Sequence, residues 1–410
     1  MKCPVCESVV QSKWKFCPEC GINAKEFKRP YGGYSIERLR QPWVEKGGEV
    51  FYKKFKAVEN VGTAPYAKIK PIRPILGDFI GVHFSNIKTF SLSSIQPRCT
   101  GELCEMYRMI GYHSVDHALR TMKLSKVVDL VGRTGLFWKV VDNSEVHKML
   151  TRGWGEVHQG VVSLVSIDRR GLQIKFRVDE GQLAYLGSDA TDFMTLNILG
   201  GNLEALCNMK CIGTEVRRGD EKYFEYQLHP KTGEIDYPLP SADEDEYERI
   251  FEKLVGDIVE NKPSGRVKLK DIVHISGEQV EVFYMMRATE GHRILEKYSG
   301  VKCGKTLAQK AGLHKEEEVW DFARNVFKQQ KVGLLQKPTK VSEGRVNIEL
   351  TESAYSAGVS DIGMKLDLFI AGIIEGLLVQ STGERWQVDE KLCIANGDGC
   401  CEFTAKVREH

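Results

Sequence analysis

Three cysteines near the end of the chain have a spacing that could support chemistry. Cys393, Cys400 and Cys401 surround a Gly-Asp pair in the sequence CIANGDGCCEF. Thiolates bind metals or cofactors, and a neighbouring thiol makes their oxidation reversible. Alternatively, Cys393 and Cys401 are small apolar residues that face a core, as free cysteines often do. The residues alone leave both interpretations open.

Two C-P-x-C pairs near the start of the chain form a second candidate site. They contain Cys3 and Cys6, then Cys17 and Cys20. Each tight turn presents two thiolates, so two turns complete the tetrahedral sulfur shell that zinc favours. The stretch resembles short N-terminal zinc ribbons and predicts a structural zinc, with unligated thiols or a redox pair as the alternative.

The surroundings of these pairs bear on the partner that the ribbon would contact. Lys13, Trp14 and Lys15 could touch nucleic acid, but Glu7 and Glu19 dilute the positive charge. A ribbon that docks to a protein, or one that is merely structural, is therefore favoured over one that binds nucleic acid, which remains a possible partner class.

Further candidate ligands lie in the first half. His113 follows a Gly-Tyr pair, and Trp154 lies in a Gly-Trp-Gly turn. Cysteine and histidine pairs at helical spacing could hold a second metal or an iron centre, although ordinary packing explains each pair separately. These pairs are Cys99 with Cys104, His113 with His117, and Cys207 with Cys211.

A hairpin and a buried helix must position the C-terminal cysteines. The Gly-Asp turn predicts a closing hairpin in which Cys393 and Cys401 face each other near its base. Residues 367–378 predict a buried helix, in which Gly372 and Gly376 allow another backbone to approach one face.

The same pattern occurs earlier in the chain in a more degenerate form. Residues 199–206 match 370–377, with Gly201 opposite Gly372 and Glu204 opposite Glu375. A second Gly-Asp pair and a strand over 223–228 follow. We interpret this as two related modules in tandem.

The helix with G-x-x-E-G-L, followed by C-x-A-x-G-D-x-x-C-x-F, resembles the 4-vinyl-reductase (4VR) domain family. The turn at Gly153-Trp154-Gly155 is similar to the G-W-G turn of those domains. The resemblance covers about residues 75–235 and 265–408, although the first copy lacks the hairpin cysteines and the second lacks G-W-G. It implies an α+β fold related to TRAPP subunits, with a hydrophobic ligand cavity and a dimerising helix layer. It also implies binding and sensing rather than proven reduction.

These observations predict five segments. They are a zinc ribbon over 1–24, an extended arm over 25–74, a first 4VR-like module over 75–240, a linker helix over 241–264 and a second module over 265–410. Because each module buries its helix layer against a partner, the two copies should pack as a pseudo-dimer.

Composition excludes little. The 410 residues have a net charge of +2, which argues neither for nor against a polyanionic partner. The chain shows neither a secretory signal nor a membrane-length apolar run, so a cytoplasmic location and reduced thiols are expected. It contains no nucleophile elbow, P-loop or dinucleotide fingerprint in the required context, so an enzyme is not favoured.

The sequence therefore predicts a regulatory protein that binds or senses a small hydrophobic molecule and docks a partner through its zinc ribbon. Haem or a tetrapyrrole is a candidate cofactor. Two alternatives stay open. One is an accessory protein or enzyme of tetrapyrrole or cofactor metabolism, and the other is a structural adaptor without a ligand.

Overall fold

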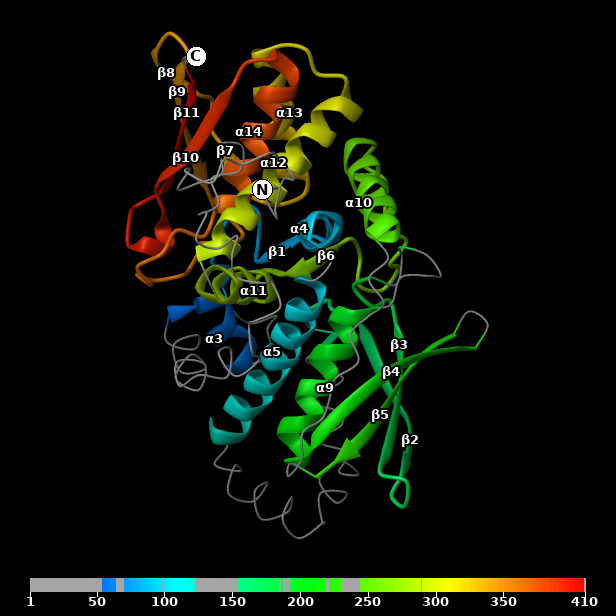
Figure 1. The fold of residues 1–410 in the computed structure, drawn as a ribbon. Coiled ribbons are helices and arrows are strands. Elements are labelled where there is room, and N and C mark those ends of the chain that lie inside the picture. The colour runs from blue at the N-terminus through cyan, green and yellow to red at the C-terminus, as the bar shows by residue number, and fades with distance from the viewer. Residues whose placement is uncertain are drawn as a thin grey trace, which may run out of the picture.

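The computed structural model describes residues 54–63, 70–96, 99–121, 154–155, 157–183, 186, 192–218, 221–230, 244–288 and 290–408. The predicted zinc ribbon, with Cys3, Cys6, Cys17 and Cys20, lies outside the described residues, as does most of the predicted arm over 25–74. The described part mixes helices with three small sheets (Figure 1).

The first half contains a four-stranded antiparallel sheet in the order β2-β3-β5-β4. Its strands are β2 (Val161–Asp168), β3 (Gln173–Asp179), β4 (Lys210–Arg218) and β5 (Glu221–His229). Helix α9 (Phe193–Cys207) packs against β4 and against the long helix α5 (Cys99–Thr121) (Figure 1). The helix that matches residues 370–377 and the strand predicted over 223–228 are therefore present.

The second half contains a sheet in the order β10-β11-β9-β7, and β8 also pairs with β9. Its strands are β7 (Leu334–Leu335), β8 (Thr339–Ser342), β9 (Arg345–Thr351), β10 (Trp386–Leu392) and β11 (Cys401–Val407). Its helices are α12 (Glu290–Ala311), α13 (Glu316–Gln329) and α14 (Leu368–Thr382). Helix α14 packs between α12 and strand β10.

Glycines allow the paired helices to touch backbone to backbone. A Cβ atom on Gly372 of α14 would lie 2.2 Å from the carbonyl oxygen of Lys297 on α12. A Cβ atom on Gly201 of α9 would lie 1.8 Å from the carbonyl oxygen of Arg108 on α5. Real side chains do not reach such distances, so the close helix approach that the sequence predicted is present and requires glycine.

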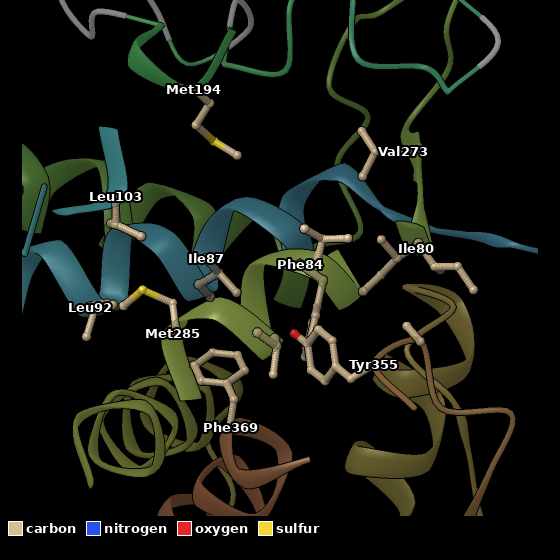
Figure 2. Close-up of a cluster of buried hydrophobic side chains, with 14 of the residues drawn as sticks. Ile80, Phe84, Ile87, Leu92, Leu103, Met194, Val273, Met285, Tyr355 and Phe369 are labelled. Atoms are coloured by element: carbon tan, nitrogen blue, oxygen red, sulfur yellow. The ribbon is translucent and has the colours of Figure 1, made fainter. Parts of the chain in front are cut away.

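The two halves meet through a short antiparallel ribbon. Strand β1 (Phe79–Gly81) pairs with β6 (Ile272–His274), with Ile80 opposite Val273. Each strand leads directly into a helix, α4 (Val82–Ile95) after β1 and α11 (Ile275–Ala288) after β6. The buried side chains around these helices come from both halves (Figure 2). The halves therefore share one core.

The segments before β1 and β6 each bind the opposite half. The Arg73 guanidinium donates to the carbonyl oxygens of Lys331 (2.8 Å) and Glu352 (3.1 Å). In the other direction, Arg266 donates to the carbonyl oxygens of Glu180 (3.2 Å) and His158. These crossed contacts tie each half to the other.

The carboxylates of Glu352 and Glu180 complete these contacts. Glu352 accepts from the backbone N–H of Leu76 at 2.8 Å, and Glu180 accepts from that of Leu269 at 2.9 Å. Each glutamate accepts from two successive backbone N–H groups, and these charge-assisted bonds help to hold the segment in place.

A buried ion cluster lies where α4 and α11 meet. Lys88 Nζ is 2.9 Å from Glu281 Oε1 and 3.3 Å from Glu278 Oε2. Tyr107 donates to Glu281 at 2.7 Å. The carboxylate of Glu296 is also buried, and its Oε1 has no hydrogen-bond partner among the described residues.

Three further elements cover this core. Helix α10 (Glu244–Val259), within the predicted linker, packs on α4, and α3 (Lys56–Thr63) packs on α11. Among the described helices, none combines the length and apolarity needed to cross a membrane.

Candidate metal centre

The predicted closing hairpin is present and its turn positions both cysteines. Cys393 directly follows β10, and Cys401 is the first residue of β11. Gly397 adopts a φ of 94° in the turn, and Asp398 Oδ2 accepts from the backbone N–H of Cys393 at 2.8 Å. The Gly-Asp pair thus closes the turn through conformations and bonds that suit these residue types.

Two acids join the cysteines to form a group of four buried donors. Asp367 precedes the first residue of α14, and Glu390 lies on β10. One donor atom from each of Asp367, Glu390, Cys393 and Cys401 lies within 4.8 Å of all the others. Among the described residues, this is the one such group of three or more Cys, His, Asp or Glu donors.

Hydrogen bonds inside the group orient its members. Cys401 Sγ donates to Asp367 Oδ2 at 3.3 Å, and Cys393 Sγ lies 3.7 Å from the same oxygen. The backbone N–H of Asp367 donates to Glu390 Oε2 at 3.2 Å. Glu390 Oε1 is buried without a hydrogen-bond partner in the described chain, which leaves a strong acceptor available.

A second layer of polar groups supports the donors. Ser353 donates to Asp367 Oδ1, and Ser356 Oγ lies 3.1 Å from Cys401 Sγ. The backbone N–H of Leu366 points at Cys393 Sγ from 3.5 Å. Such outer contacts fix the orientation of metal ligands in proteins.

Burial shifts the pKa values of this group upward. Burial raises the pKa of Asp367 and raises that of Glu390 well above its usual value. The hydrogen bond with Cys401, and then burial, raise the pKa of Cys393. The bond with Cys393 lowers the pKa of Cys401, but burial and the charge of Asp367 outweigh it, so its net shift is upward. A cation would stabilise the deprotonated forms.

The donor set fits a divalent thiophilic ion. Tetrahedral zinc binds sulfur at about 2.3 Å and oxygen at about 2.0–2.2 Å, which places ligand atoms roughly 3–4 Å apart. The observed separations need only small side-chain adjustments to reach that shell. Two thiolates and two carboxylates would fill all four positions, and the unpaired Glu390 Oε1 would gain a partner.

The other predicted site residues lie elsewhere. Cys400 is half-buried beside Cys401 and is not one of the four donors. His113 lies on α5, where its ring packs against Tyr112 with centroids 5.6 Å apart. Trp154 is buried, and Asn202 accepts from its Nε1 at 3.1 Å in the amide orientation that satisfies both neighbours. His113 and Trp154 therefore belong to the first half, apart from the hairpin.

Sequence reasoning found the cysteines but missed both acids. Glu390 precedes Cys393 by three residues, and Asp367 is the first residue of the predicted buried helix. An acid before an apolar helix has the ordinary role of an N-cap, so its position alone gave no sign of a ligand.

The first half has acids in a similar setting but a lysine in place of thiols. Asp192 precedes the first residue of α9, and its backbone N–H donates to Glu215 Oε2 at 2.8 Å. Lys222 Nζ lies 3.4 Å from Glu215 Oε1. Burial raises the pKa of Asp192, and the charge of Lys222 opposes that shift. This site therefore contains its own cation.

Comparisons with known proteins find partial similarities, and no family profile matches the chain. Uncharacterized protein MJ0150 of Methanocaldococcus jannaschii is 24% identical over 159 residues, 39% of this chain and 90% of that protein. A vinyl-4-reductase family protein of known structure from the same organism is 23% identical to this chain. The similarity covers 28% of this chain and 68% of that protein, with a TM-score of 0.23. The phenol-responsive sensory domain of the transcription activator PoxR, solved with phenol, is 13% identical to this chain. The similarity covers 38% of this chain and 89% of that domain, with a TM-score of 0.30.

Proposed function

We propose that this chain is a regulatory metal-binding protein that holds one thiophilic divalent ion, preferably Zn²⁺, in its second half. The ligands would be Asp367, Glu390, Cys393 and Cys401. The observation that carries this proposal is the convergence of these four buried donors. Four protein ligands leave no open position for water or substrate, so the ion would serve structure and signalling rather than catalysis.

A metal explains this group better than a redox switch does. A reactive cysteine needs thiolate character and solvent access. Cys393 and Cys401 are both fully buried, and the pKa of each thiol is raised. Free thiols in this setting would react slowly with oxidants, whereas a bound metal deprotonates a coordinating thiol outright.

We also propose that the two halves are related modules that pack as a pseudo-dimer. The segments before β1 and β6 support this, because Arg73 and Arg266 make the same kind of contact in opposite directions. The acids at the helix starts support it too, since Asp192 and Asp367 each donate from the backbone to a glutamate. Counted from these two acids, Gly201 of α9 corresponds to Gly376 of α14. The sequence match instead places Gly201 opposite Gly372, one helical turn earlier in α14.

The signal to which the protein responds would be the metal together with the small apolar molecule that the sequence predicts. We propose the second half for that molecule, because this half has the intact hairpin motif with both cysteines. The predicted N-terminal zinc ribbon would then dock a protein partner. Native mass spectrometry tests the apolar ligand, since a bound organic mass should accompany the purified chain.

Metal analysis of thiol variants tests the central proposal. The double variant Cys393→Ser, Cys401→Ser should contain one metal ion fewer per chain than the wild type, and Cys400→Ser should contain the same number. The difference isolates this centre from any metal at the N-terminal cysteines. Loading with Co²⁺ provides a second readout, because thiolate-to-cobalt absorption should fall in the double variant only. Equal metal content in the wild type and in a folded double variant would refute the centre.

A further inference from the structure

The chain between β9 and α14 touches the metal centre on one side and the most N-terminal described segment on the other. Residues 353–362, here called the strap, contain both serines that contact the donor group. Resting on the proposed metal function, we infer that the strap transmits occupancy of the metal centre to the segment Lys54–Thr63. The chain before this segment carries the two C-P-x-C pairs.

Side-chain and backbone contacts couple the strap to the centre at three points. Ser353 donates to Asp367, and Ser356 Oγ lies 3.1 Å from Cys401 Sγ. The backbone N–H of Ile362 donates to the carbonyl oxygen of Ala395, inside the hairpin turn, at 2.8 Å. The strap therefore contacts both the helix start and the turn that hold the donors.

The opposite edge of the strap forms an isolated β-bridge with the N-terminal segment. Phe55 forms an antiparallel bridge with Val359. The N–H of Lys56 donates to the carbonyl oxygen of Gly358 at 2.9 Å, and the N–H of Ser360 donates to that of Lys54 at 2.8 Å. These backbone bonds require the strap to be in place.

Side-chain contacts also hold this segment. Phe55 is fully buried and packs edge-on against Phe283 of α11, with centroids 5.3 Å apart. Lys54 Nζ donates to the carbonyl oxygen of Asp361, which again belongs to the strap, at 3.2 Å. Loss of the strap contacts would remove backbone and side-chain bonds of this segment together, so its local opening depends on the strap.

Metal binding would hold in place the two donors that the strap contacts. Ser356 Oγ lies 3.1 Å from Cys401 Sγ, and Ser353 donates to Asp367. An ion bound by both Asp367 and Cys401 would fix the helix start relative to the hairpin, and outer contacts of this kind are ordered together with the ligands. Occupancy therefore fixes the strap and, with it, the edge that pairs with Lys54 and Lys56.

Hydrogen–deuterium exchange on the full-length protein tests this coupling. Chelated protein is compared with the same protein after Zn²⁺ is added. We expect exchange to slow by about tenfold in peptides covering 54–63 and 353–362, as well as in the hairpin around Cys393. Peptides covering 161–183 of the first-half sheet serve as the control and should not change.

Two variants make each outcome decisive. In Cys393→Ser, Cys401→Ser, added Zn²⁺ should leave peptides 54–63 unchanged; slower exchange there would show that another zinc site is responsible and would overturn the coupling. Ser356→Ala should keep the slowing in the hairpin and lose most of it in 54–63. An unchanged 54–63 response in Ser356→Ala would also overturn it.

Failure of the coupling can be separated from failure of the metal centre. If Zn²⁺ protects the hairpin of the wild type but not residues 54–63, the metal centre stands and the coupling is wrong. If Zn²⁺ protects neither and does not bind, the proposed function itself fails.

Discussion

Glu296 is a buried acid in the central ion cluster, and its surroundings favour the protonated form. Burial raises its pKa from 4.5 to about 7, and the positive charge of Lys88 offsets only part of that shift. Glu278 and Glu281 face the same space from α11 and oppose its ionisation, while His292 favours it. A buried acid with this shift remains protonated in the folded protein after it has ionised in the unfolded chain.

We predict that the free energy of unfolding depends less on pH in Glu296→Gln than in the wild type. Because the folded-state pKa is raised, the contribution of Glu296 is fully present below pH 4.5 and is lost as the pH rises to about 7. Relative to the wild type, the variant should therefore gain on the order of 2–3 kcal/mol in unfolding free energy between pH 5 and pH 8. Urea unfolding at both pH values measures this, with the exposed Glu349→Gln as the control. Parallel curves for the wild type and Glu296→Gln would contradict it.

The candidate ligands show what sequence can predict at the scale of residues. Cys393 and Cys401 flank a recognisable turn, so their approach followed from local chemistry. Asp367 lies 26 residues before Cys393, and only the packing of α14 against the hairpin brings them together. That contact depends on tertiary structure, so no short pattern in the sequence marks Asp367 as a ligand.

At the scale of elements, the glycines of α14 are required by its contact with α12. In Gly372→Ala, the new Cβ atom would lie 2.2 Å from the carbonyl oxygen of Lys297, so the helices must separate. We expect a loss of about 2–4 kcal/mol, because a backbone contact cannot relax as a side chain can. Gly256→Ala in α10 is a matched control, since nothing lies within 4 Å of its Cβ position. It should be neutral or gain up to about 1 kcal/mol. Similar thermal unfolding of the two variants would argue against a tight α12–α14 contact.

Helix α4 shows why some elements were not predicted. Its 14 residues are rich in serine and aromatic residues, and twelve of them are buried. An element that is buried all round lacks the apolar stripe by which a helix is recognised in sequence. By contrast, α13 buries one face and exposes the other, and a sequence pattern recognises this arrangement most readily.

At the scale of the whole molecule, the contacts of Arg73 and Arg266 with the opposite halves should make the halves unfold together. Arg73 is fully buried, and its guanidinium also donates to the carbonyl oxygen of Gly77 at 2.7 Å. Arg73→Ala leaves several carbonyl groups of both halves without partners and should cost about 3–5 kcal/mol. The exposed Arg345→Ala should stay within about 0.5 kcal/mol of the wild type. Calorimetry should show one transition moved to lower temperature. Two transitions, of which only one moves, would mean that the halves unfold independently.

The difference between the halves leads to a final prediction about metal content. Lys222 provides the first half with a built-in cation beside Glu215 and Asp192, whereas the second half has Cys401 and Cys393 beside Glu390 and Asp367. Lys222→Ala would leave buried carboxylates without that charge, so we expect a loss of about 1–3 kcal/mol in unfolding free energy. It should not change the number of bound metal ions, because the first-half site lacks thiolates. In contrast, Cys401→Ser should lower metal content. Metal analysis and urea unfolding of both variants separate these effects, and loss of a metal ion in Lys222→Ala would show that the first half also binds one.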